Sequence, residues 1–228
     1  MKYDAVIFDL FGTLVDTYTI EMYDDMLRRM AEALGLPFGP FREAWMRTFR
    51  ERIVGEFRTT RECIEVVCDR IGVDPDSGRV ERAVGIRNEV TRSMLVPRPD
   101  VLDTLDRLRG MDLRLGLISD CSCEVPPLWE GTPMAPRFDA AVFSCLFRNR
   151  KPHPEIYREC CRRLGVRPEG CLYVGDGSSR ELTGAVRVGM TPVLIRVPYD
   201  TYGWHRPDAE EWTGPVISTI SGVLRFLG

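Results

Sequence analysis

The chain has 228 residues, of which 44% are hydrophobic and 29% charged, and it carries a net charge of −3 with a pI near 5.6. Its length suits one large core, or a core domain with a smaller insert, and it lacks the broad positive excess of a nucleic-acid-binding protein. No run of 18 apolar residues predicts a membrane span, and no signal peptide is expected. The eight cysteines form no C-x-x-C pair, so we expect mostly buried, reduced thiols in a cytoplasmic protein.

The first expected element is a short buried strand that ends at a carboxylate. The apolar run 6–8 contains β-branched residues, Asp9 follows it, and Gly12 and Thr13 then turn the chain. Because ligands of open α/β sheets bind beyond the carboxyl ends of the strands, we expect Asp9 to point into a site. A carboxylate in that position can act as a covalent nucleophile or bind a hard cation such as Mg²⁺.

Residues 17–95 show helical periodicity instead. Apolar residues recur at spacings of three and four in four stretches, and Gly35 and Gly72 end two of the expected helices. We therefore predict a cap domain of about four helices, inserted after the first strand. The two prolines of 96–99 stiffen the return of the chain to the core.

Strand and helix patterns alternate from residue 100 onward. Strands are expected at 113–118, 140–143, 171–174 and 192–197. Helices are expected at 100–109, 154–164, 181–188 and 216–227. Residues 122–137 read as a loop or short helix, and 198–215 as a polar loop rich in aromatic residues. The repeated units predict an α/β core, formed by 1–16 and 96–228, with a parallel sheet and helices on both faces.

Four polar residues fall just after a strand or on a loop of this core: Asp9, Ser119, Lys151 and Asp176. Their chemistry is complementary for phosphoryl transfer. Asp9 can attack phosphorus, Ser119 and Lys151 can hold the phosphoryl oxygens, and Asp176 can help to hold Mg²⁺.

The order of these residues resembles that of the haloacid dehalogenase-like hydrolase superfamily, over nearly the whole chain. Four stretches carry the resemblance: Asp9-Leu-Phe-Gly-Thr-Leu-Val15, Leu117-Ile-Ser-Asp120, Arg150-Lys-Pro152, and Val174-Gly-Asp-Gly-Ser-Ser-Arg-Glu181 followed by Gly184-Ala185. The resemblance implies a Rossmann-like core in which the strand before Asp9 lies beside the strand before Asp176. It also implies that the helical insert is a mobile cap that selects the substrate.

The same resemblance assigns roles to individual residues. Asp9 is the nucleophile, and the backbone carbonyl of Phe11 joins Asp9 and Asp176 around Mg²⁺. Glu181 stands in the outer shell around the metal. The phosphate is bound by Thr13, Ser119, Asp120 and Lys151, of which Ser119 and Lys151 also belong to the catalytic set with Asp9.

Three departures from the pattern bear on the reaction. Phe11 replaces the acid that phosphatases of the family use to protonate the leaving oxygen, a loss worth on the order of 10²–10⁴ in rate, and dehalogenases of the family also carry an aromatic residue there. Asp176 is kept, and its repulsion with Asp9 calls for a cation, which favours phosphoryl chemistry. Asp120 stands where asparagine is common, and a carboxylate only accepts hydrogen bonds, which disfavours halide binding.

The preferred hypothesis is therefore a Mg²⁺-dependent phosphohydrolase that acts on a small phosphorylated metabolite through an aspartyl-phosphate on Asp9. We expect a monomer or homodimer with no nucleic-acid or membrane partner. Two alternatives stay open: a metal-independent 2-haloacid dehalogenase-like hydrolase, and a non-catalytic protein that binds a phosphorylated ligand. His153 is interpreted as a first-turn residue of its helix and His205 as a packing residue.

Overall fold

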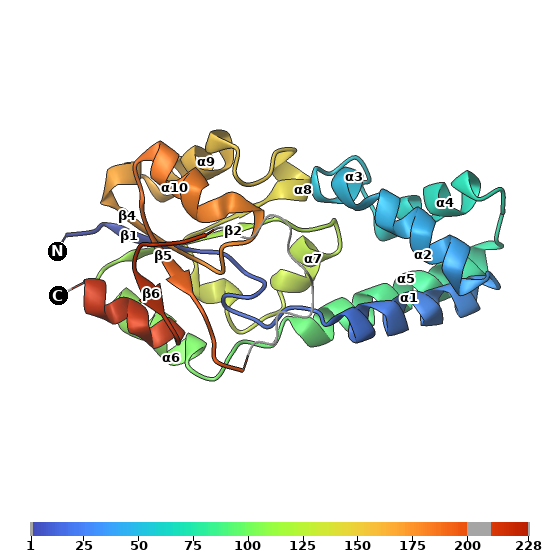
Figure 1. Ribbon diagram of the computed structural model, residues 1–228, viewed down its shortest axis with the longest axis horizontal. Coiled ribbons are helices and arrows are strands. Elements are labelled where there is room, and N and C mark those ends of the chain that lie inside the picture. The colour runs from blue at the N-terminus through green and yellow to red at the C-terminus, as the bar shows by residue number, and fades with distance from the viewer. Residues whose placement is uncertain (1, 200–210, 228) are drawn as a thin grey trace.

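A parallel sheet forms the centre of the protein, and helices cover both of its faces (Figure 1). The computed structural model describes residues 2–199 and 211–227. Six strands lie in the order β3-β2-β1-β4-β5-β6, and every neighbouring pair is parallel. Their bounds are Ala5–Phe8 for β1, Arg114–Ser119 for β2, Ala140–Phe143 for β3, Cys171–Gly175 for β4, Thr191–Ile195 for β5 and Val216–Ile217 for β6. The predicted α/β class is confirmed, and β1 lies beside β4 as the resemblance implied.

Alternate side chains of the central strand β1 enter two separate apolar cores. Val6 and Phe8 pack on one face of the sheet, and Ala5 and Ile7 on the other. The helices that cover the two faces are α6 (Val101–Gly110) with the 3-10 helix η4 (Ile220–Phe226), and α9 (Pro154–Leu164) with α10 (Glu181–Val188). Because both faces are buried, β1 reads in the sequence as a continuous apolar run rather than as an alternation.

Five helices lie between β1 and α6 and form a separate group beside the sheet (Figure 1). They are α1 (Ile20–Leu34), α2 (Phe38–Arg47), α3 (Phe49–Ile53), α4 (Thr60–Arg70) and α5 (Ser77–Met94). Their apolar stripes, which include Met26, Leu27 and Met30, pack into a core of their own. The predicted helical insert is confirmed, whereas its boundaries at residues 16 and 96 stay a prediction.

Capping residues explain the helix ends that were predicted correctly from the sequence. The side chain of Thr19 accepts a hydrogen bond from the backbone of Met22 at the start of α1, and Gly35 ends this helix with a left-handed φ of 74°. Gly165 ends α9 in the same way, with a φ of 70°. The strand at 140–143 and the helices at 154–164 and 181–188 agree with the structure to the residue.

The final predicted helix at 216–227 is wrong in its first part and in its type. Val216 and Ile217 form β6, which pairs with Leu194 and Ile195 at the edge of the sheet. The backbone of Leu194 donates to the carbonyl of Pro215, and that of Arg196 donates to the carbonyl of Ile217, and only the 3-10 helix η4 follows. The short helix α7 (Val125–Trp129) lies within the stretch 122–137 that was predicted as a loop or short helix, whereas the short helix α8 (Ser144–Phe147) was not predicted.

All eight cysteines lie within the described residues, where they are free thiols, and seven of them are buried, as expected. No helix in the described ranges has the length and apolar character needed to cross a membrane. His205 lies outside the described residues.

Candidate active site

The predicted polar residues converge at the carboxyl edge of the sheet. Asp9 follows β1, Ser119 ends β2 and Asp176 follows β4, while Lys151 lies in the loop before α9. Each of these four side chains is at most 4% exposed. Adjacent parallel strands end at one edge of a sheet, so residues far apart in the sequence meet in one buried site.

Lys151 joins two of the carboxylates. Its Nζ donates to Oδ1 of Asp9 at 2.5 Å and to Oε2 of Glu181 at 2.6 Å. The hydroxyl of Thr13 donates to the other Asp9 oxygen at 3.1 Å. Both oxygens of Asp9 are therefore held in place by hydrogen bonds.

Asp9, Asp176 and Glu181 offer oxygen atoms that all lie within 4.8 Å of one another. Hard cations such as Mg²⁺ prefer carboxylate oxygens, so this donor set fits that ion. The ammonium of Lys151 pairs with two of these buried carboxylates, Asp9 and Glu181, and the third buried carboxylate, Asp176, lies beside them. Such an excess of buried negative charge is stabilised by a bound cation.

Glu181 is fixed from several sides. Its Oε2 accepts from the Tyr173 hydroxyl at 2.8 Å in addition to Lys151, and its Oε1 accepts from the backbone N–H of Gly177 at 2.9 Å. Both oxygens are already engaged, which suits a position beyond the direct ligands. Asp176 in turn accepts from the backbone N–H of Ser178 at 2.9 Å.

The site raises the pKa of its buried acids Asp9 and Glu181 and also that of its base Lys151, for different reasons. Burial is the largest cause that raises the pKa of Asp9 above its ordinary value, and the neighbouring Asp176 raises it further against the attraction of Lys151. Burial likewise raises the pKa of Glu181 well above its usual range. For Lys151, burial alone lowers the pKa, but attraction by Asp9 and Glu181 outweighs it and holds the pKa well above its usual value.

Gly12 brings the loop after β1 against Asp176. Its φ of +85° is in the left-handed region, and a Cβ at this position would lie 2.0 Å from Oδ2 of Asp176. Glycine is therefore required both by the backbone conformation and by the closeness of the carboxylate.

The remaining predicted residues differ in how they relate to this centre. Ser119 Oγ is buried and has no hydrogen-bond partner among the described residues, so its hydroxyl is available to a ligand. Oδ1 of Asp120 accepts from the backbone N–H of Lys151 at 3.0 Å, and it thereby positions the lysine loop. His153 is exposed, and its ring nitrogen accepts from the backbone of Glu155 at the start of α9, in line with its interpretation as a first-turn residue.

Phe11 is half-buried and packs toward the helical insert. Its ring centroid lies 6.1 Å from that of Tyr18. A phenyl ring cannot transfer a proton, so this position contributes apolar surface where an acid would offer acid–base chemistry. The role of its backbone carbonyl toward a metal stays a prediction.

Two supporting residues were missed by sequence reasoning. Arg98 is buried, and its Nη1 donates to the carbonyls of Gly12 and Thr13 while its Nε donates to Asp16 at 2.8 Å. No spacing pattern in the sequence links residue 98 to this loop. Tyr173, which donates to Glu181, could have been suspected from the sequence, because its hydroxyl is unusual in the otherwise apolar strand β4.

A family model described as haloacid dehalogenase-like hydrolase matches residues 3–189. The chain therefore belongs to this family, and it is a hydrolase. It is 34% identical over 198 residues to a glyceraldehyde 3-phosphate phosphatase from Methanopyrus kandleri, which covers 84% of this chain and 83% of the relative. It is 30% identical to a phosphoglycolate phosphatase from Salmonella typhimurium, which covers 98% of this chain and 92% of the relative.

Among solved structures, the fold is similar to that of a 2-haloacid dehalogenase from Pseudomonas syringae. The TM-score is 0.70 at 24% identity, with 99% of this chain and 98% of that chain covered. This likeness concerns the fold alone.

Proposed function

We propose that this hydrolase removes phosphate from a small phosphorylated metabolite, with Mg²⁺ as cofactor and Asp9 as covalent nucleophile. The observation that carries the proposal is the cluster of Asp9, Asp176 and Glu181 oxygens within 4.8 Å of one another. A cation between these carboxylates would relieve their repulsion and would face the incoming phosphate. Two relatives that are named phosphatases, one for glyceraldehyde 3-phosphate and one for phosphoglycolate, support the same reaction class.

The proposed reaction has two steps at Asp9. In the first, a carboxylate oxygen of Asp9 forms a bond to phosphorus, and the bond from phosphorus to the leaving oxygen breaks with its electron pair on that oxygen. In the second, water attacks the same phosphorus, and inorganic phosphate leaves while the Asp9 carboxylate is restored. Mg²⁺ held by Asp9 and Asp176 would supply charge neutralisation for the phosphoryl oxygens.

The other residues act by holding charge and geometry. Lys151 and Thr13 orient the Asp9 carboxylate, and the same ammonium is close enough to balance negative charge on the transferred group. The unpartnered hydroxyl of Ser119 can donate to a phosphoryl oxygen. Glu181 also accepts a hydrogen bond from Lys151 and so helps to hold its Nζ in place.

Phe11 sets the expected substrate preference. Because the leaving oxygen receives no proton from this position, substrates that expel a stable anion, such as aryl and acyl phosphates, should react faster than alkyl phosphates. The half-buried ring of Phe11 lies toward Tyr18 of the insert, and the Tyr18 hydroxyl donates to the hydroxyl of Thr91 at 3.2 Å.

The test is phosphate release from p-nitrophenyl phosphate and from acetyl phosphate, with Mg²⁺ and with chelator. The matched control is Asp9→Asn, which keeps the size of the side chain and removes its charge. Release that requires both Mg²⁺ and Asp9 supports the proposal. No release under any condition would sink it.

The aromatic residue at position 11 also favours the rival reaction, displacement of halide from a 2-haloacid by Asp9 without metal. Halide release from 2-chloropropionate that is indifferent to chelator would support that rival. Binding of a phosphorylated ligand without turnover of any substrate would instead support the non-catalytic alternative.

A further inference from the structure

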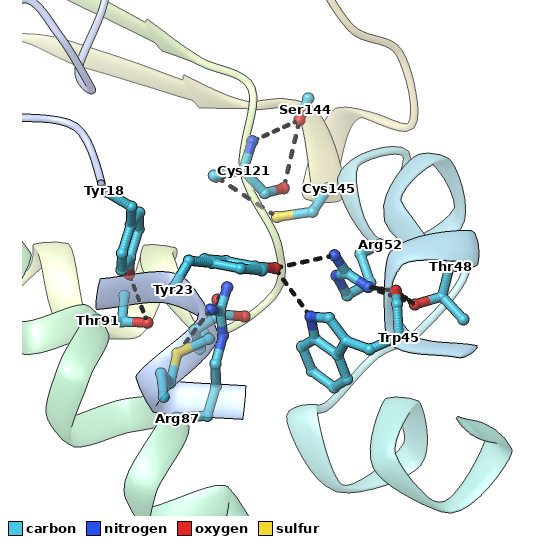
Figure 2. A network of polar contacts seen from close by, with 12 residues as sticks. Tyr18, Tyr23, Trp45, Thr48, Arg52, Arg87, Thr91, Cys121, Ser144 and Cys145 are labelled. Atoms are coloured by element: carbon cyan, nitrogen blue, oxygen red, sulfur yellow. Dashed lines mark hydrogen bonds and ion pairs between the residues drawn. The ribbon is translucent and has the colours of Figure 1, made fainter. Parts of the chain in front are cut away.

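A buried guanidinium in the helical insert has no carboxylate partner among the described residues. Arg52 of α3 is 3% exposed. Its Nη1 donates to the carbonyl of Trp45 at 2.5 Å and to the hydroxyl of Thr48, and its Nη2 donates to the hydroxyl of Tyr23 at 3.3 Å (Figure 2). The guanidinium carbon lies 4.4 Å from the centre of the Trp45 ring. All of these partners are neutral.

Arg87, the other buried arginine of this region, is a useful comparison because its guanidinium is paired with a carboxylate of the protein. Its Nε and Nη2 donate to Oε1 of Glu124 at 2.9 and 2.6 Å, so its charge is balanced within the protein. Arg87 and Arg52 both lie beside Tyr23, because the Arg87 guanidinium carbon is 5.8 Å from the Tyr23 ring centre. Glu124 thus balances the charge of Arg87, whereas no carboxylate among the described residues pairs with Arg52. A buried charge without a counter-charge is costly, so such a charge indicates an anionic ligand.

The hydrogen bonds of Arg52 also indicate which edge is free to bind. Nη1 is used by the insert itself, whereas Nε is buried with no partner and Nη2 has only the long bond to Tyr23. Nε and Nη2 form the edge of a guanidinium that donates two parallel hydrogen bonds to a carboxylate. Figure 2 shows the Tyr23 hydroxyl directed at Arg52 and at the Trp45 indole, which donates to it at 2.8 Å.

A chain of aromatic rings connects Tyr23, which binds Arg52, to the loop that carries the nucleophile. The Tyr23 ring meets the Tyr18 ring at 5.6 Å, and Tyr18 meets Phe11 at 6.1 Å. Phe11 is two residues from Asp9.

The end of α3 is also seated on the core. Gly55, which follows α3, is so close to α8 that a Cβ there would lie 1.7 Å from the carbonyl oxygen of Cys145. The thiol of Cys145 in turn lies 4.0 Å from that of Cys121, which is two residues from Ser119. Arg52 is thus held where the insert meets the loops that carry the candidate phosphate site.

We propose that Arg52 binds a carboxylate of the substrate, so that the favoured substrates are phosphomonoesters with a second, carboxylate anion. This inference rests on the proposed function, because it assigns the phosphate of the same molecule to Asp9 and Lys151. Arg52 is then a specificity-determining residue, and the carboxylate of the substrate balances the charge of its guanidinium.

The test compares two ligands that differ only in the second anion, 3-phosphoglycerate and glycerol 3-phosphate. Binding is measured by calorimetry in the presence of Mg²⁺ on the Asp9→Asn protein, which makes the result independent of turnover. We expect 3-phosphoglycerate to bind about 10- to 100-fold more tightly, the range for hydrogen bonds to a charged group. Arg52→Gln should remove this difference and leave the affinity for glycerol 3-phosphate unchanged.

Arg50 supplies the matched control, because it lies on the same helix α3 but is exposed. Arg50→Gln removes the same charge and should leave the preference for the carboxylate intact. Thr48→Val serves as the structural control, since it removes a partner of Arg52 at the same helix junction and keeps the guanidinium. It should also leave the preference intact.

Equal affinity for the two ligands in the parent protein would overturn the inference, and so would equal weakening of both ligands by Arg52→Gln. If Arg52→Gln fails to fold, Arg52→Lys decides, because it keeps the charge but loses the two-pronged donor edge. It should lower the preference, and a full preference in this variant would contradict the assignment. Turnover of p-nitrophenyl phosphate by the parent protein reports separately on the proposed function, so the two can fail independently.

Discussion

The ammonium nitrogen of Lys151 lies 2.5 Å from Oδ1 of Asp9, and both side chains are buried at the carboxyl edge of the sheet. This contact joins the first strand of the core to a loop that comes 142 residues later in the chain. The same nitrogen is 2.6 Å from Glu181, so one cation holds two acids in a fixed arrangement.

Replacing Lys151 by methionine should therefore affect both stability and activity. The variant leaves Asp9 and Glu181 buried without their counter-charge, and breaking a buried pair in this way costs about 3–5 kcal/mol. Urea unfolding followed by circular dichroism measures this loss. An unfolding midpoint equal to that of the parent protein would show that the ion pair contributes no stability.

A second prediction concerns metal binding at the acidic cluster. Mg²⁺ should raise the melting temperature, since an ion at about 100 times its dissociation constant stabilises by about 2.7 kcal/mol. Asp176→Asn should weaken this effect, whereas Asp103→Asn, which changes an exposed residue of α6, should not. Differential scanning fluorimetry with a Mg²⁺ titration and with chelator checks the expectation. A melting temperature of the parent protein that does not change with Mg²⁺ concentration would count against the metal site.

A third prediction tests the missing acid. Phe11→Asp should increase the hydrolysis of alkyl phosphates relative to p-nitrophenyl phosphate, by up to the 10²–10⁴ that general acid catalysis typically supplies. Phe11→Leu is the control, because it removes the ring without adding an acid. The measurement is the ratio of kcat/KM for the two substrate types. If Phe11→Leu changes this ratio as much as Phe11→Asp, protonation of the leaving group is not what position 11 limits.

A fourth prediction concerns the close approach of Gly12 to Asp176. Gly12→Ala places a Cβ into the space of Oδ2 of Asp176 and strains a backbone with a φ of +85°. We expect loss of Mg²⁺ affinity and of activity, with destabilisation of about 1 kcal/mol or more from the backbone alone. Gly85→Ala in α5 is a suitable control, because no atom lies within 4 Å of the Cβ it would gain. Unchanged metal affinity in Gly12→Ala would contradict the argument.

A fifth prediction addresses how the insert is attached. Arg87 of α5 and Glu124, which precedes α7, form a buried ion pair between the insert and the core, with Nη2 and Oε1 at 2.6 Å. Arg87→Met and Glu124→Leu should each destabilise the protein by about 3–5 kcal/mol, and the double variant that combines them should recover much of the loss. Thermal unfolding of the four proteins of this cycle gives the coupling. Additive effects would exclude a direct interaction.

The sequence predicted the fold well where apolar runs and glycines agree. Gly165 ends α9, and the apolar run before Asp9 is β1, because buried parallel strands leave an unmistakable continuous pattern. The end of the chain was different. Val216 and Ile217 fit a helical stripe in the sequence, but the open edge of β5 offers them backbone partners, and only the assembled sheet reveals that edge.

The candidate site was predicted unevenly for a similar reason. Asp9 and Asp176 follow strands that the sequence identifies, so their meeting follows from the order of the sheet. Arg98 and Arg52 could not be found in this way. Arg98 binds two carbonyls and the Asp16 carboxylate, Arg52 binds a carbonyl and hydroxyls, and neither has a repeating pattern around it. Their importance rests on burial, which depends on how the insert and the core fold together.

Arg98 also bears on how the insert can move. The backbone N–H of Arg98 donates to the carbonyl of Leu14 at 3.0 Å, and its side chain holds Gly12, Thr13 and Asp16. The outgoing and returning segments are thus tied together next to the nucleophile. We expect any swing of the insert to be absorbed beyond this tie, with slow hydrogen exchange at 12–15 and faster exchange at 17–19. The two segments that connect the insert to the core would then act as one hinge, and the loop that carries Asp9 would keep its conformation while the insert moves.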